Sequence, residues 1–144
     1  MATTDYREFA RRMLTHDRAA PATAGECASA VGSVHQRLHH RLAPLVGAAG
    51  VRALLARSVA FTSKEYPPLA AIPDQDSGDS ARAAESLVQL LSQFEYAVAW
   101  EIAQALYANF IGLVVSLLGE RLVLVVLQRA FPNIDVSTQQ EPEK

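Results

Sequence analysis

Apolar residues recur at steps of three and four along most of the chain, the spacing of a helix with one buried face. Residues 5–14 form a first short candidate helix, with Asp5 and Glu8 placed to cap its start. A second helix starts at Thr23, where Thr23-Ala24-Gly25-Glu26 has the pattern of a capping box. Its apolar stripe consists of Cys27, Val31, Val34, Leu38, Leu42 and Leu45. Strand-type alternation is hard to find, so the pattern predicts an all-α fold.

Proline and glycine divide this pattern into segments. Pro44, Gly47 and Gly50 predict that the second helix breaks or kinks, because proline cannot continue a regular helix without losing a hydrogen bond. A further stripe then runs through Val51, Leu54, Leu55 and Val59. The helix that carries this stripe should stop before Pro67-Pro68. Turn-forming residues over 67–79 predict a flexible connector.

The C-terminal half begins with one long predicted helix, starting near Asp79 or Ser80. Its apolar face carries Leu87, Leu90, Leu91, Phe94, Val98 and Ile102. Residues 105–118 are apolar almost all round, which is typical of a central core helix or an oligomer interface. A membrane span needs about 20 apolar residues, and this run is shorter and includes Asn109. The sequence therefore argues against a membrane as partner.

After a break at Gly119 the apolar run resumes over residues 122–127, and a polar tail follows Phe131-Pro132. The whole pattern predicts a compact bundle of about five or six helices, with long central helices in the C-terminal half. At 144 residues the chain has the size of a single domain. We expect that domain to span residues 1–132 and the tail, residues 133–144, to be disordered.

Charge and cysteine content narrow the classes of function. Net charge is −2, with nine basic against five acidic residues over 1–66 and four against ten over 67–144. That asymmetry suits packing of one half on the other or head-to-tail association. The pI near 6.1 argues against nucleic acid as the main partner. The spacing of Ala43 and Gly47 matches a helix-turn-helix turn, but the following helix has few groups that read base edges. With Cys27 as the single cysteine and no signal peptide, we expect a cytoplasmic protein.

Two histidines have the spacing of metal ligands. His35 and His39 lie four residues apart, so both imidazoles could bind one ion from the same helix face. Two more ligands would be needed, and His16 is one possibility. Cys27 is two turns away and predicted to face the core, and no carboxylate lies at a matching spacing nearby. The alternative interpretation is a polar helix flank on which the histidines are incidental.

His40 carries a different hypothesis. His40-Arg41-Leu42, with Gly50 ten residues later, distantly resembles the phosphohistidine motif of histidine-phosphotransfer bundles. The resemblance implies phosphorylation of His40 in a signalling bundle. The sequence departs from the motif at Ala43 and Pro44, where a lysine and a glycine are expected, so the cation that favours the phosphate is missing.

Aromatic residues appear where the long C-terminal helix loses its polar face. Tyr96, Trp100 and Tyr107 supply large amphipathic area, and together with Phe110 they are candidates for an interface with a second subunit. The alternative is burial of these side chains under another helix of the same chain.

No phosphate-binding loop, nucleophile elbow or carboxylate pair is found, so the sequence predicts neither a catalytic residue nor a cofactor. The leading hypothesis is a non-enzymatic helical interaction or regulatory protein of a bacterial type, which forms a homodimer or binds another protein. The alternatives are the phosphotransfer-like bundle and a helical bundle that binds a small ligand or a metal ion.

Overall fold

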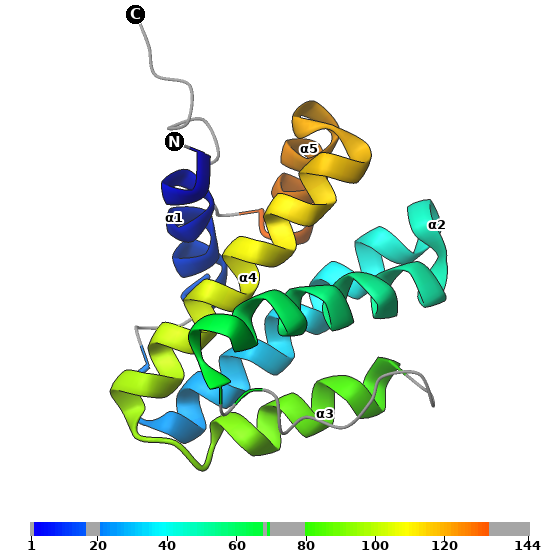
Figure 1. The fold of residues 1–144 in the computed structure, drawn as a ribbon. Helices are drawn as coiled ribbons and strands as arrows, with labels where there is room; N and C mark the ends of the chain where they lie inside the picture. Colours follow the sequence, from blue (N-terminus) through cyan, green and yellow to red (C-terminus); the bar gives the residue numbers. More distant parts are fainter. Residues whose placement is uncertain (1, 17–20, 68, 70–79, 133–144) are drawn as a thin grey trace, which may run out of the picture.

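The computed structural model describes residues 2–16, 21–67, 69 and 80–132 (Figure 1). Its elements are α1 (Ala2–Leu14), α2 (Ala24–Glu65), α3 (Ser80–Leu91), α4 (Tyr96–Leu118) and α5 (Glu120–Ala130). No strand occurs in these ranges, so the predicted all-α fold is confirmed. Most of the predicted connector over 67–79 and all of the predicted tail lie outside the described residues.

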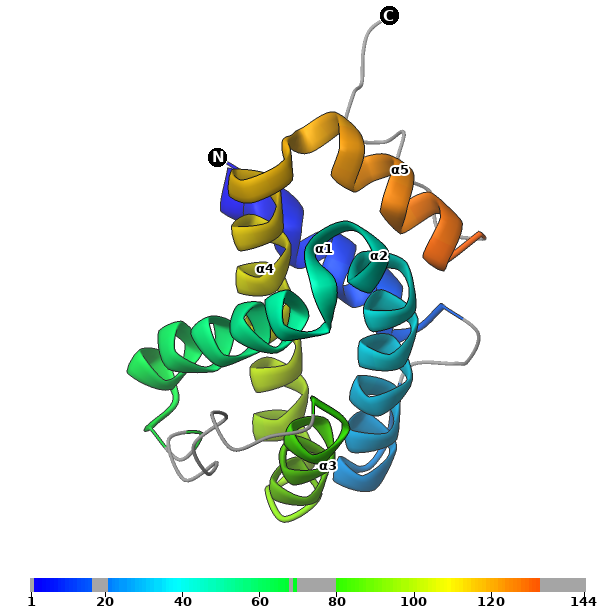
Figure 2. The ribbon, with the colours of Figure 1, turned by 90° about the vertical axis from the view of Figure 1, so that its right-hand side faces the viewer.

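Helix α4 lies at the centre of the fold and packs against α1, α2 and α5 (Figures 1 and 2). Every side chain from Ile102 to Ala108 is buried, which requires neighbours all round the helix. The prediction of a central core helix in this part of the chain is therefore confirmed.

Helix α2 consists of two arms that meet at Gly47. Its start is fixed by the predicted cap, in which the Thr23 hydroxyl accepts a hydrogen bond from the Glu26 amide at 3.1 Å. Gly47 has φ 83° and ψ 156°, a conformation open essentially to glycine alone, so the helix bends here. Both arms contact α4. The Tyr107 hydroxyl donates to the Val31 carbonyl of the first arm, and Asn109 Nδ2 donates to Thr62 Oγ1 of the second.

A second glycine corner joins α4 to α5. Gly119 has φ 93° and ends α4, while α5 begins at the next residue and folds back toward the first arm of α2. The three helices share an apolar contact region made of Leu38, Leu42, Phe110, Ile111, Val114, Val123, Val126 and Leu127. The predicted breaks near Gly47 and at Gly119 are therefore both correct.

The prediction of one long helix from residue 79 onward is wrong. The chain turns over Ser92–Glu95, so that α3 packs along α2 while α4 enters the core. Leu87, Leu91 and Ile102 are buried as predicted, but Val98, in phase with them, is 39% exposed. In the sequence, the apolar residues keep a helical spacing across the turn, so the pattern predicts one helix. A single straight helix over residues 80–118 would carry Leu87 and Leu91 away from the core.

Candidate functional site

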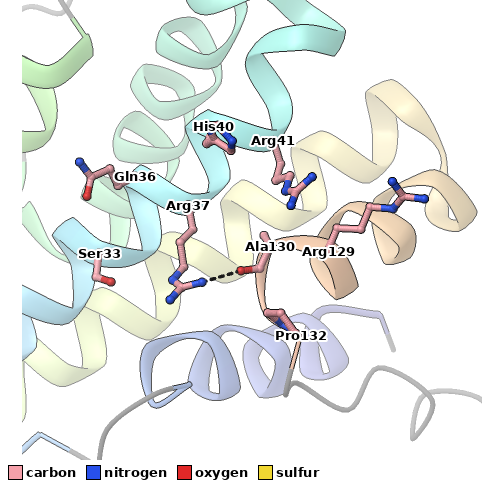
Figure 3. A pocket seen from close by; sticks show the side chains of 8 residues that line it. All are labelled: Ser33, Gln36, Arg37, His40, Arg41, Arg129, Ala130 and Pro132. Atoms are coloured by element: carbon pink, nitrogen blue, oxygen red, sulfur yellow. Dashed lines mark hydrogen bonds between the residues drawn. The ribbon is translucent and has the colours of Figure 1, made fainter.

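An open hollow of about 660 Å³ lies between the first arm of α2 and the C-terminal end of α5 (Figure 3). It is lined by Ser33, Gln36, Arg37, His40, Arg41, Arg129, Ala130 and Pro132. The α2 residues are spaced at three and four, so they share one helix face. Three arginines and a histidine therefore gather at one site, with no acidic side chain among the described residues that line it.

Arg37 is held in place by α5. Its Nη1 donates to the Ala130 carbonyl at 2.9 Å (Figure 3). Its guanidinium lies 5.7 Å from the centre of the Phe131 ring. A carbonyl at a helix C-terminus lacks an intrahelical partner and carries partial negative charge, so a cation is favoured there. Arg37 thus ties α5 to α2 and fixes one wall of the hollow.

Arg41 and Arg129 are in a different situation. Both side chains are exposed, and neither has a carboxylate within salt-bridge distance in the part of the chain that the structure describes. By contrast, Arg11 and Arg12 both pair with Glu8 on α1. The charge on Arg41 and Arg129 is therefore available to an anionic group entering from solvent.

The basic hollow continues into an apolar strip by helical register. Leu45 lies one turn beyond Arg41 on α2, and Val125 and Leu122 lie one and two turns before Arg129 on α5. These three side chains are 48%, 47% and 39% exposed. We call the hollow and this strip the α2–α5 groove; one end is cationic and the other apolar.

His40, the predicted phosphorylation residue, is exposed and lines the basic hollow. The arginines around it would favour an anion, although they occupy other positions than the lysine that the motif resemblance implies. Phosphorylation of His40 stays a prediction.

His35 and His39, the predicted metal ligands, lie on another side of the same arm. His35 is 5% exposed, and its ring centre is 6.2 Å from that of His39. Neither ring nitrogen of His35 nor Nδ1 of His39 has a hydrogen-bond partner among the described residues. Burial, and secondarily the neighbouring His39, lower the pKa of His35 to about 4. His35 is therefore a neutral imidazole at physiological pH.

The four predicted interface residues do not form one surface. Tyr107 and Phe110 are 0% and 1% exposed and belong to the chain's own core, because the arms of α2 and helix α5 cover the middle of α4. Tyr96 is 37% exposed and Trp100 is partly buried. The interface prediction therefore stays with Tyr96 and Trp100, which lie one helical turn apart on the same face of α4.

Cys27 is buried, as its place on the apolar stripe predicts, and desolvation together with Glu26 raises the pKa of its thiol. A raised pKa disfavours the reactive thiolate.

Helices α2 and α4 are long and apolar enough to cross a membrane by length and composition. Core helices of soluble proteins pass the same test, and the middle of α4 is buried within the chain.

Sequence reasoning missed the α2–α5 groove. Arg37 and Arg41 are one turn apart and could have been grouped from sequence, but no local pattern links them to Arg129. The comparisons with known proteins add no further candidate: no family model matches the chain, and neither the curated proteins nor the solved structures contain a significant match.

Proposed function

We propose that this chain is a non-enzymatic interaction protein whose α2–α5 groove binds an acidic, amphipathic segment of a partner protein. The observation that carries the proposal is the convergence of Arg37, Arg41 and Arg129 on one hollow, with exposed apolar side chains one and two turns further along the same two helices. Carboxylates of the segment would pair with the arginines, and its apolar side chains would cover Leu45, Leu122 and Val125.

Charge complementarity favours this partner over others. Arginine presents a planar fork of donors that matches a carboxylate, and a hydrogen bond to a charged group contributes about 1.5–3 kcal/mol. Phosphate or nucleic acid would also be attracted by the arginines, but neither explains the apolar end of the groove. The chain as a whole carries a net charge of −2, so its positive potential is local to this site rather than spread along a nucleic-acid-binding face.

The probe for this proposal is a fluorescein-labelled synthetic helical peptide with glutamate and leucine on one face, titrated with the full chain at low salt. We expect Arg41→Gln and Arg129→Gln each to weaken binding about tenfold, equivalent to about 1.4 kcal/mol. Arg57→Gln is the matched control, because Arg57 is also exposed but lies on the other arm of α2. Raising the salt concentration should weaken peptide binding more for the native chain than for the two arginine variants, because the native chain makes more ion pairs with the peptide.

Other occupants give distinguishable outcomes. Phosphatidylserine vesicles, inorganic phosphate and duplex DNA are tested in parallel with the peptide. The chain could bind one of these three probes through Arg41 and Arg129 and fail to bind the peptide. That result would contradict the proposal that the partner is a protein segment. Equal peptide affinity for the arginine variants and the control overturns the site itself.

The homodimer is a second proposal, on a separate face. Tyr96 is exposed in the first turn of α4, and the partly buried Trp100 lies one turn after it on the same face. Large amphipathic side chains of this kind are enriched at protein interfaces. Light scattering of the native chain should report the mass of two copies, and a monomer at high concentration would contradict the proposal.

A further inference from the structure

We infer that His35 and His39 form a two-histidine binding site for a late first-row divalent ion, such as Cu²⁺, Ni²⁺ or Zn²⁺. The site lies on the first arm of α2 and is separate from the α2–α5 groove. It gives a role to side chains that the proposed protein-binding function leaves unused.

The first support is a set of unsatisfied polar atoms. Both ring nitrogens of His35 and Nδ1 of His39 are buried without a hydrogen-bond partner in the described ranges. Leaving a buried donor or acceptor unpaired costs about 1–3 kcal/mol, so native structures rarely do so without an ion, a water or a functional reason. An ion would take one ring nitrogen of each histidine, and His35, at 5% exposure, has little access to bulk water as an alternative partner.

The second support is geometry. The two residues are separated by one helical turn, which places their side chains on the same face. Their ring centres lie 6.2 Å apart and the rings are tilted by 43°. Metal–nitrogen bonds of about 2.0–2.1 Å in a tetrahedral site bring two imidazole centres to about 5 Å. A small rotation of the side chains closes the remaining difference.

The chemistry of the donors selects the ions. A neutral imidazole, with a free ring nitrogen as the donor, is the form that binds metal. Imidazole suits zinc, copper and nickel, with copper bound most tightly at a given site. No group of three or more histidine, cysteine or acidic side chains gathers around an ion position among the residues the structure describes, so the two imidazoles are the protein ligands. Water would complete the coordination from the side of His39, which is only partly buried.

The position of the pair on α2 keeps the ion away from the groove arginines. Gly32 faces α3, where a Cβ would lie 3.3 Å from Val88. His35 and His39 follow Gly32 by three and seven positions and continue along that side of the helix. Arg37 and Arg41 each come two residues after one of the histidines, so they point to nearly the opposite side. The bound cation therefore lies across the helix from the positive charge of the groove.

The test uses the full chain without an affinity tag, titrated with Cu²⁺ alone. We expect one tight ion per chain and an electron paramagnetic resonance spectrum with two nitrogen ligands. His35→Gln and His39→Gln should each weaken affinity about tenfold or more, because each removes one arm of a chelate, and each spectrum should lose one nitrogen. His40→Gln, next to the pair on an exposed face, is the control and should match the native chain.

Several results would overturn the site. Absence of stoichiometric Cu²⁺ binding is one, and affinity or spectrum unchanged in both variants is another. Because His35→Gln alters a buried position, circular dichroism checks its fold, and His39→Gln, at the more exposed position, carries the conclusion if His35→Gln unfolds. A native fold with unchanged copper binding in His39→Gln refutes the chelate.

Discussion

Tyr96 and Tyr107 lie on one helix, and their surroundings differ completely: Tyr96 is 37% exposed and Tyr107 is fully buried. The middle of α4 is enclosed because α1, both arms of α2 and α5 pack around it. The first turn of α4 extends beyond most of these neighbours. Aromatic side chains thus stabilise the core at one position and are exposed to solvent at another. The position of the neighbouring helices, not the residue type, decides between the two.

The largest effect that separates these two regions should come from Tyr107→Ala. Removing a fully buried aromatic ring leaves a cavity, so we expect the free energy of unfolding to fall by about 3–5 kcal/mol. Urea denaturation measures the change. Tyr107→Phe is the control, because it keeps the ring and loses only the 3.4 Å hydrogen bond to Val31, for a cost of about 1 kcal/mol. A loss below 1 kcal/mol for Tyr107→Ala would mean that the middle of α4 is not enclosed.

The burial of His35 on α2 should appear in the dependence of stability on pH. The pKa of His35 is lowered from 6.5 to about 4, so between these values the unfolded chain binds a proton that the folded chain does not. The contribution of His35 to the free energy of unfolding is therefore complete above pH 6.5. As the pH falls toward 4, the free energy of unfolding decreases by about 3 kcal/mol in total.

Urea denaturation at pH 7.5, 6 and 5, with a chelator present, measures this slope. His35→Gln should lose most of it, whereas His40→Gln should keep it because His40 is exposed. A slope of the same size in His35→Gln would show that another group titrates.

A smaller effect is expected where the buried helix ends. Gly119 has φ 93° and ψ 149°, and a side chain there is strained even though an added Cβ would meet no atom within 4 Å. Gly119→Ala should cost about 1–3 kcal/mol. Gly112→Ala is the matched control within α4, since its Cβ would meet Tyr6 at an ordinary 3.7 Å. That substitution should be neutral or stabilise the fold by up to about 1 kcal/mol.

The smallest effect on stability is expected at the exposed end of α4. Tyr96→Ala should change the free energy of unfolding by less than about 0.5 kcal/mol, yet it should weaken association of two chains. Light scattering over a concentration series measures the association. Phe61→Ala is the control, because Phe61 is 43% exposed on α2 and lies outside the proposed interface. If the two variants associate equally weakly, the first turn of α4 is not part of the interface.

The sequence predicted those parts of the fold that local chemistry determines. The Thr23 cap, the bend at Gly47 and the corner at Gly119 each depend on one residue type at one backbone position. The turn over Ser92–Glu95 was missed because it contains neither proline nor glycine and leaves the helical phase unchanged. Only the packing of α3 on α2 requires the chain to turn there.

The candidate sites also differ in whether local sequence or tertiary packing determines them. His35 and His39 are neighbours on one helix, so their pairing could be predicted from spacing alone. The α2–α5 groove depends on Arg129 lying beside Arg37 and Arg41, which follows from the Gly119 corner and the packing of α5. Burial of Tyr107 and Phe110 likewise depends on which helices surround α4, and periodicity carries no information on that.

The central place of α4 has a consequence for synthesis of the chain on the ribosome. Helices α1 and α2 are made first, but their main packing partner is α4, which is completed only at Leu118. Until that residue leaves the exit tunnel, the apolar faces of the first half have little to pack against. The nascent chain therefore passes through a long interval as exposed helices, which aggregate more readily than the finished fold and are the kind of surface that chaperones bind.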